Sequence, residues 1–521
     1  MTQTSTTSVL RGAHRAPTSY WRRLAADTWL VSRATVVAHA LGAVTSIALR
    51  MVLDPAAMGV WQGLKLALSY GNYSNLGVSK AAIRDYTVAL GRHSEDVVDG
   101  DGGHAAYAGL DVAFTASMAA SAVYASVMAL AAAAVALSAD DGWSRIWACG
   151  LVLVGLLAIV QRYVTFQITI LRARQRFDHT AAVSVVEAVA TLAAAVSLAW
   201  TFGVLGLCAA TLLVSLASVV YLRRAGAWTA LAWTWDAPRL RRLVRTGAPM
   251  LAAGVVFSLF RSVDRIAILA GIDDREQALG LYSIALMASA QLFGVANVLA
   301  IVVGPRLARL FGQTGRRDQV AELAARTTEL LAAMLVLPAA VGLVLAPAVI
   351  GALLPKYTAG LPALVWLVPS TVLLGMTLPA GQSLVSVYRE RTQLVLVGVA
   401  TLVAALGAWT AIKLDAGIVG VAAAMALANV VHFATTVALA IRAPLAGARW
   451  RSCLVRWIAV GVPTMLPAIV FTQSSSGALH VVALQLLVVV LVWLATLAAA
   501  WRWGGWSQLL TGHAPVAGEF A

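Results

Sequence analysis

Long apolar blocks alternate with short polar or basic connections along this sequence. Fourteen of these blocks are 19 residues or longer. Since a helix crosses the hydrocarbon core of a bilayer with about 20 apolar residues, each block predicts a membrane-spanning helix. The expected fold class is therefore an all-α polytopic membrane protein with about 14 transmembrane helices. The predicted spans cover residues 29–52, 57–79, 107–137, 147–170, 180–200, 203–222, 247–270, 279–303, 327–353, 359–384, 392–412, 416–441, 453–471 and 479–501.

Basic residues are distributed unevenly between the connections on the two sides. With the N-terminus placed inside, 28 of the 38 Lys and Arg residues fall in inside segments and 4 in outside loops. Cytoplasmic loops collect Lys and Arg, so this bias predicts that both termini are cytoplasmic. The polar, basic start precedes an apolar run that is too long for a signal-peptide core, so we expect no cleaved signal. The expected location is the bacterial cytoplasmic membrane.

Composition excludes several classes of protein. Of the 521 residues, 60% are hydrophobic and 12% are charged, which excludes a soluble globular enzyme and a disordered chain. The inside loops explain the net charge of +15, so no nucleic-acid partner is expected. Cys149, Cys208 and Cys453 lack metal-ligand spacing, and no phosphate-binding loop motif is present. The outside loops are too short for a membrane glycosyltransferase or polymerase. We therefore expect no metal, no cofactor and no enzymatic activity.

Two stretches of the chain repeat weakly. Gly59-Val-Trp61 corresponds to Gly280-Leu-Tyr282, and the run 203–210 matches the run 417–424. Repeats of this kind are typical of secondary transporters, which bind substrate between two related halves. The predicted organisation is a cytoplasmic tail (1–28), a six-helix N-lobe (29–222), a basic linker (223–246), a six-helix C-lobe (247–442), two extra helices (443–502) and a second cytoplasmic tail (503–521), with a central cavity between the lobes.

Ionisable side chains inside the predicted spans are the candidates for substrate recognition. Each costs at least roughly 2.5–3.5 kcal/mol at the centre of the bilayer, so its presence needs a reason. Six are positive and two are negative, which favours an anionic cargo such as a phosphate or diphosphate. The candidate residues of a cationic cavity are Arg33, Arg50, Lys65, Arg162, Arg261 and Arg265, and the candidate ion-pairing or coupling residues are Asp264 and Glu187.

Some of these charges have an alternative explanation. Arg33 and Arg50 lie near the ends of the first span, from which a long side chain can reach the headgroups. Lys65 lies about eight residues below the outer surface, ~12 Å at 1.5 Å per residue, so its side chain reaches the headgroups less easily.

The seventh span carries the densest cluster. Arg261 and Arg265 share a helix face, and Asp264 is spaced to pair with Arg261. The cluster is then either a structural ion pair or a site in which Asp264 holds one arginine while the other faces the cavity. For Glu187 the alternatives are a proton carrier and an ion-pair partner of Arg162.

The inner half of the second span is too polar to face lipid. It reads Ser69-Tyr-Gly-Asn-Tyr-Ser-Asn75. Such a stretch lines a wet cavity or makes hydrogen bonds between helices, and the sequence leaves both open. The candidate glycan-facing residues are Tyr70, Asn72, Tyr73 and Asn75.

Several of these segments resemble a known family. Gly59-Val-Trp61, the run 76–84 and Leu90-Gly91-Arg92 look like the first signature block of the polysaccharide-transport (oligosaccharidyl-lipid) flippases. This family belongs to the multidrug/oligosaccharidyl-lipid/polysaccharide (MOP) exporter superfamily. The runs 264–269 and 279–285 are similar to its seventh-helix block and to the start of its eighth helix. Residues 305–308, Tyr357 and the run 417–424 also follow its pattern.

The resemblance implies a two-lobed bundle of twelve or fourteen helices around a cationic cavity. Such proteins move undecaprenyl-diphosphate-linked oligosaccharides from the inner to the outer leaflet by alternating access. The implied partners are a polyprenyl-diphosphate-linked oligosaccharide, membrane lipids, and the polymerase and glycosyltransferases of surface polysaccharide synthesis. Only Asp264 and the motif positions transfer from the family. The alternatives are a lipid II flippase and a cation-coupled small-molecule or multidrug exporter.

Overall fold

The computed structural model describes residues 18–92, 101–138, 142–174, 176–445, 447–474 and 479–504, and these residues form helices and no strand. Most of the two predicted tails lies outside the described residues. The predicted all-α class is confirmed. The helices are α1 (Thr18–Val52), α2 (Pro55–Gly71), α3 (Val78–Arg92), α4 (Asp101–Ser138), α5 (Gly142–Ala173), α6 (Phe177–Arg224), α7 (Ala237–Phe260), α8 (Val263–Gly271), α9 (Arg275–Thr314), α10 (Arg317–Leu353), η2 (Pro355–Gly360), α11 (Leu361–Ser386), α12 (Glu390–Lys413), α13 (Gly417–Val437), η3 (Ala438–Arg442), α14 (Gly447–Ser474) and α15 (Leu479–Gly504).

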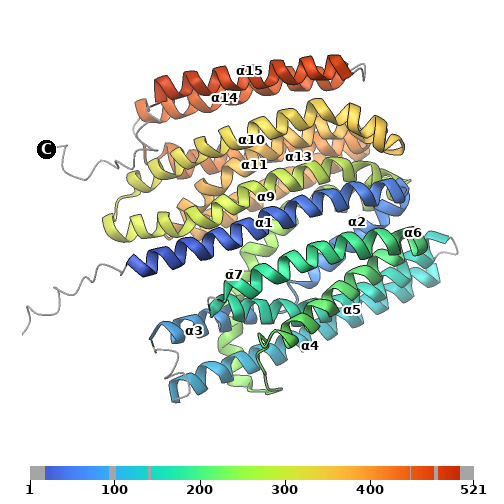
Figure 1. Ribbon diagram of the computed structural model, residues 1–521, viewed down its shortest axis with the longest axis vertical. Coiled ribbons are helices and arrows are strands. Elements are labelled where there is room, and N and C mark those ends of the chain that lie inside the picture. The colour runs from blue at the N-terminus through green and yellow to red at the C-terminus, as the bar shows by residue number, and fades with distance from the viewer. Residues whose placement is uncertain are drawn as a thin grey trace, which may run out of the picture.

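The helices form two bundles and an added pair (Figure 1). In the first bundle, the N-lobe, α1 packs against α6, and α5 contacts α2, α4 and α6. In the second, the C-lobe, α11 contacts α9, α10 and α13, and α12 packs against α13. The pair α14 and α15 packs against α10, on the side of the C-lobe away from the N-lobe. Helix α1 begins and α15 ends at the same end of the molecule, which we call the inner end, and the opposite end is the outer end.

Ten described helices are long and apolar enough to cross a membrane, or eleven if the bent α7 counts as one span. Helix α6 contains two of the predicted spans. It reverses at Gly203, where φ is 58° and ψ is −134°, and Gly206 then lies too close to the carbonyl of Leu198 to leave room for a Cβ atom. The number fourteen stays a prediction, because α2 has 17 residues and α1 is only partly apolar.

Two predicted spans are broken helices. The span predicted at 57–79 is divided into α2 and α3 by a turn in which Leu76 and Gly77 have φ values of 49° and 78°. The span predicted at 247–270 is divided into α7 and α8 at Arg261 and Ser262. Backbone without helical hydrogen bonds is tolerated at membrane depth only inside protein or beside water, so both breaks mark the interior of the molecule.

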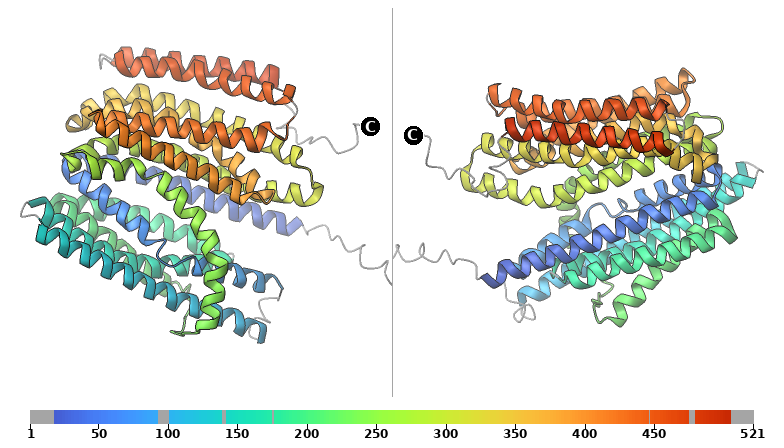
Figure 2. Two further views of the ribbon diagram at one scale, coloured as in Figure 1. Left: turned by 180° about the vertical axis from the view of Figure 1, so that it is seen from behind. Right: turned by 45° about the horizontal axis from the view of Figure 1, so that its top comes forward.

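Helix α7 connects the lobes. It bends by 41° between its segments Ala237–Pro249 and Leu251–Phe260, and it contacts α3 of the N-lobe as well as α12 of the C-lobe. Gly77 and Gly247 touch backbone to backbone, with no room for a Cβ atom on either. The turning course of α7 from one lobe to the other is visible in Figure 2.

The lobes meet at the outer end, where α2 lies along α9. Gly59 packs on the carbonyl of Glu276, and Gly280 packs on the carbonyl of Pro55. These two glycines are the repeat pair of the sequence, and the fold places both in this contact, where only a residue without a side chain fits. Lys356 also pairs with Asp54 across it.

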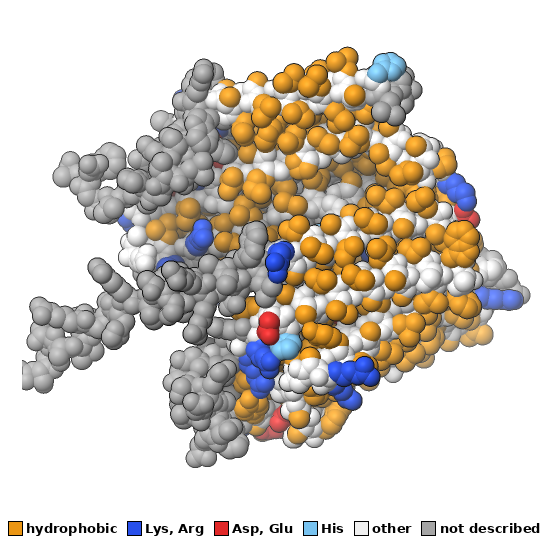
Figure 3. All heavy atoms as spheres, in the orientation of Figure 1, with side chains coloured by type: hydrophobic (Ala, Val, Ile, Leu, Met, Phe, Trp, Pro, Cys, Tyr) orange, Lys and Arg blue, Asp and Glu red, His pale blue; other side chains and the backbone are white. Residues whose placement is uncertain are grey.

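The surface around the sides of the two bundles is apolar. Figure 3 shows hydrophobic side chains spread over the helices, with Lys and Arg gathered mainly toward the edges. Leu130 and Leu137 of α4 are 71% and 89% exposed. Such a surface suits lipid rather than water.

Candidate substrate-binding site

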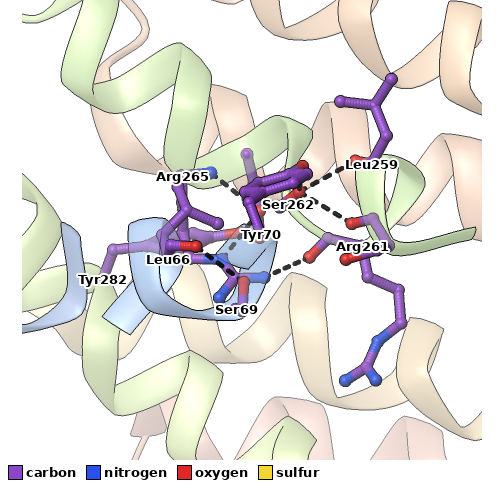
Figure 4. A network of polar contacts seen from close by, with 10 residues as sticks. Leu66, Ser69, Tyr70, Leu259, Arg261, Ser262, Arg265 and Tyr282 are labelled. Carbon is purple, nitrogen blue, oxygen red and sulfur yellow. Dashed lines mark hydrogen bonds and ion pairs between the residues drawn. The ribbon is translucent and has the colours of Figure 1, made fainter. Parts of the chain in front are cut away.

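The broken helices of the two lobes meet in the interior. The hydroxyl of Tyr70, one residue before the end of α2, lies 2.5 Å from Oγ of Ser262 in the break between α7 and α8 (Figure 4). Ser262 Oγ also donates to the carbonyl of Ser258 at 2.7 Å. Broken helices expose backbone groups where transporters bind substrate, which makes this junction the centre of the candidate site.

Asp264 is held by two protein groups. Its Oδ2 accepts a hydrogen bond of 2.9 Å from the Tyr282 hydroxyl, and its Oδ1 accepts one of 2.8 Å from the backbone N–H of Arg265. Arg265 Nε lies 3.7 Å from the same carboxylate, and Arg265 Nη2 donates to the Arg261 carbonyl at 2.6 Å. Asp264 therefore pairs with Arg265 and not with Arg261, because the helix break turns the Arg261 side chain away.

Arg261 is left without an anionic partner. Its guanidinium carbon lies 3.9 Å from the ring centroid of Phe293 in α9, and Figure 4 shows it pointing away from Arg265. Within the described part of the chain the guanidinium makes no hydrogen bond and no ion pair. A cation on an aromatic face keeps its donors free for a ligand.

Lys65 of α2 is the second cation of this kind. It is solvent-exposed although it lies among protein groups of both lobes, close enough to Arg50 and Arg265 to interact electrostatically. Among the residues described, its Nζ has no hydrogen-bond or ion-pair partner. Because Lys65 is exposed and lies beside Arg265 of the facing lobe, solvent reaches this residue in the space between the lobes. We call this space the inter-lobe cleft.

Arg50 and Arg162 do not offer free donors to the cleft. Arg50 is 4% exposed and bonds Ser46, at 2.7 and 2.6 Å, and Ser283 across the lobes, at 3.2 and 2.9 Å. Arg162 is 6% exposed and donates to the Gly71 carbonyl at 2.9 Å and to Ser121 Oγ at 3.3 Å. The carbonyls at the end of α2 lack intrahelical donors, and Arg162 supplies one.

Of the other predicted residues, some have free polar groups and some are bonded within the protein. Arg33 is exposed on α1, and no partner is found for it among the described residues. Asn75 is buried, donates to Ser79 Oγ at 2.9 Å and accepts from Gly77 N at 3.2 Å, so it holds the turn instead of facing a glycan. Asn72 is exposed and Tyr73 is half-buried, which leaves these two available beside Tyr70.

The comparisons with known proteins agree with this architecture. Residues 104–356 match a family model described as polysaccharide biosynthesis protein. A lipid II flippase, MurJ, in an inward closed conformation superposes with a TM-score of 0.66 at 12% identity, covering 91% of this chain and 99% of the flippase. A multidrug resistance MATE family transporter in an inward-facing conformation gives 0.57 at 14% identity, over 84% of this chain and 96% of the transporter. A MOP superfamily transporter from Pyrococcus furiosus gives 0.55 at 14% identity, over 80% and 94%. The chain shares the fold of these transporters. The predicted resemblance is confirmed, and no curated protein matches the chain in sequence.

Glu187 lies apart from the inter-lobe cleft. It lines a cavity of about 260 Å³ between α5 and the two halves of α6, and its Oε1 accepts a 2.7 Å hydrogen bond from Ser218. It does not pair with Arg162, whose donors are used on α2 and α4. The polar lining of this cavity includes Gln161, Thr165, Thr191, Thr211 and Ser215.

Sequence reasoning missed several partners in the site. Ser262, Phe293 and Ser283 were not singled out, and Tyr282 was noted only as part of a repeat and of the family-like run 279–285, without a role in the site. Within the described residues no group of three or more His, Cys, Asp or Glu side chains is placed to hold a metal ion.

Proposed function

We propose that this protein is a flippase that moves a polyprenyl-diphosphate-linked oligosaccharide from the inner to the outer leaflet by alternating access. The observation that carries the proposal is the pair of unpartnered cations, Lys65 on the N-lobe and Arg261 on the C-lobe, at membrane depth. A cation at membrane depth without a counter-ion is costly, and an anionic ligand between the two removes that cost.

The diphosphate fits this chemistry. Guanidinium and ammonium groups form strong charge-assisted hydrogen bonds with phosphate oxygens, and Lys65 and Arg261 approach from opposite lobes. Asn72 and Tyr73 supply amide and hydroxyl groups for sugar hydroxyls. The prenyl chain remains in lipid while the headgroup crosses. The protein acts here as a transporter, and its residues form and break no covalent bond.

Two alternatives share the fold. A lipid II flippase carries the same diphosphate, and one similar structure has that name, so the cations do not separate the two cargoes. The match to a polysaccharide biosynthesis family model favours the oligosaccharide. An exporter of cationic drugs is disfavoured, because Asp264, the carboxylate at the junction, is 3% exposed and already bonded.

The deciding experiment is a flipping assay with the purified protein in liposomes. Fluorescent lipid-linked oligosaccharide and fluorescent lipid II are compared as cargo, with a membrane-impermeant quencher reporting the accessible leaflet. We expect transport of the oligosaccharide, loss of more than tenfold in Lys65→Ala and in Arg261→Ala, and partial recovery in Lys65→Arg. Lys413→Ala is the matched control, since Lys413 lies over the Trp409 ring outside the cleft. Equal transport by all variants would refute the proposal, and faster transport of lipid II would reassign the cargo.

We also propose that Glu187 couples transport to protons. The carboxylate lies in its own polar cavity, and Ser218 donates a hydrogen bond to it. An imposed pH gradient is expected to accelerate the wild-type protein and to leave Glu187→Gln unchanged, whereas Glu390→Gln, an exposed control at the start of α12, follows the wild type. A gradient response that survives in Glu187→Gln would exclude this role.

A further inference from the structure

One face of α7 continues from Arg261 toward the inner end of the molecule. Gly254 lies seven residues before Arg261, which places it on nearly the same face about 10 Å away. Ala252 and Ala253 beside it are exposed. The α7 helix therefore offers a smooth, small-residue surface below the candidate site.

Two side chains of the N-lobe reach this surface. A Cβ atom on Gly254 would lie 3.5 Å from Cε1 of Tyr73 and 3.6 Å from Nζ of Lys80. Tyr73 is also close enough to Arg261 to interact electrostatically. Lys80 and Tyr73 thus both lie at Gly254, and Arg261 follows about 10 Å farther along α7, at the helix break.

Lys80 is solvent-exposed, lies against Gly254 of α7 and carries no counter-ion among the described residues. Gly254 is nine residues beyond the exposed Arg245, about 13 Å along the helix. In the part of the chain that the structure describes, Lys80 has no hydrogen bond and no ion pair.

The carboxylates on neighbouring elements are engaged elsewhere. Asp85 of α3 pairs with Arg84 at 3.1 Å, and Asp111 of α4 accepts a 2.9 Å hydrogen bond from Ala232 N. Lys80 is therefore a third unpartnered cation, separate from Lys65 and Arg261 and nearer the inner end.

We infer that Lys80, with Tyr73 beside it, forms a first binding station for the diphosphate headgroup of a lipid that enters from the inner leaflet. The headgroup binds at Lys80 and then moves along α7 to Lys65 and Arg261. This inference rests on the proposed function and adds an entry step to it. The absence of a side chain at Gly254 keeps the passage between the two stations open.

Gly254 makes the inference testable without removing a cation. Both neighbours of a new Cβ atom lie at ordinary van der Waals distance, so a small side chain fits. In Gly254→Asp the new carboxylate lies next to the Lys80 amine and competes with the phosphate, whereas Gly254→Asn has the same shape without the charge. The probe is farnesyl diphosphate, whose binding to the purified full-length protein is measured by calorimetry.

We expect Gly254→Asp and Lys80→Gln to weaken farnesyl diphosphate binding at least tenfold, and Gly254→Asn to stay within about twofold of the wild type. Inorganic pyrophosphate is expected to bind at least tenfold more weakly than farnesyl diphosphate. Equal binding of the two would assign the station to free diphosphate and overturn its role in lipid entry.

The remaining outcomes separate the inference from the proposed function. If Lys65→Ala loses binding while Gly254→Asp and Lys80→Gln keep it, the first station is wrong and the flippase proposal stands. If Gly254→Asn loses as much as Gly254→Asp, the effect is steric and the station is also wrong. If the wild type binds neither probe, headgroup recognition fails at both stations.

Discussion

The outer end of the lobe interface and the inter-lobe cleft differ in whether their charged side chains have protein partners. At the outer end polar groups have protein partners: Arg50 bonds Ser283, Lys356 pairs with Asp54, and Trp147 Nε1 donates to Glu276 at 3.0 Å. In the inter-lobe cleft Lys65, Arg261 and Lys80 have none among the described residues. Partnered groups hold two lobes together, whereas unpartnered cations of the same kind are free to hold a ligand. Whether a membrane arginine has a protein partner, more than how deep it lies, therefore decides between a structural role and a binding role.

The strongest test of this comparison removes both free cations of the central site. In the double variant Lys65→Ala/Arg261→Ala we expect farnesyl diphosphate binding to fall by about a hundredfold or more, since hydrogen bonds to charged groups contribute about 1.5–3 kcal/mol each. Protein yield and thermal stability should fall little, because neither side chain has a hydrogen-bond or ion-pair partner among the described residues and only the contact of Arg261 with the Phe293 ring is lost. Calorimetry and a melting curve measure the two effects, and a lower melting temperature with unchanged binding would reverse the assignment.

The next test uses one glycine from each end. Gly280→Ala adds a methyl group against the backbone of Pro55, which has nowhere to move while α2 and α9 stay in contact. We expect the outer end to open, seen as a longer distance between spin labels at Ser138 and Lys413 after removal of the exposed Cys149. Gly254→Ala, at the inner end, should leave that distance unchanged. Equal distances in both variants would show that the outer contact is not tightly packed.

Arg50→Ala should loosen the outer contact by a smaller amount. The substitution removes the two bonds to Ser283, worth about 3–6 kcal/mol between the lobes if each contributes about 1.5–3 kcal/mol. The same pair of spin labels is expected to show a mixture of short and long distances. Arg50→Lys, which keeps the charge but not the fork of donors, is the control. If Arg50→Ala instead weakens farnesyl diphosphate binding with the labels unmoved, Arg50 belongs to the binding residues.

Lys356→Ala should have the smallest effect. Lys356 and Asp54 have side chains that are 67% and 66% exposed, and such surface pairs contribute about 0–1 kcal/mol. The spin-label distances and the melting temperature are expected to stay close to those of the wild type. A clear opening of the outer end in this variant would mean that the exposed pair, not the buried Arg50, closes it.

Much of the fold follows from the sequence in simple physical terms. Apolar length determines which segments become helices, and the spacing of the blocks places the reversal at Gly203 between two predicted spans. The break at Arg261 and Ser262 has no such signal, since neither proline nor glycine stands there and the apolar pattern runs through it. What distinguishes this position is its contact with Tyr70, 192 residues away in the chain, which is a property of the tertiary structure.

The candidate site could be predicted in type but not in detail. The excess of positive charge in the spans identified all the arginines and lysines that the central junction uses. Their roles depend on contacts between residues far apart in the chain. Ser283, the partner of Arg50, is 233 residues away, and Gly71, whose carbonyl accepts a hydrogen bond from Arg162, is 91 residues away. A single sequence contains no information on such pairs, so Arg50 and Arg162 look the same as Arg261.

Helix α7 imposes a geometrical condition on any movement of the lobes. It contacts both α3 and α12, and it bends by 41° between its segments Ala237–Pro249 and Leu251–Phe260. If the lobes rotate against each other, the curvature of this one helix has to change, and Arg261 is carried relative to Gly247 as it does. The distance between two dyes, one attached to each segment, would therefore report the movement of the lobes during transport. The bend angle near Pro249 would measure how far that movement has gone.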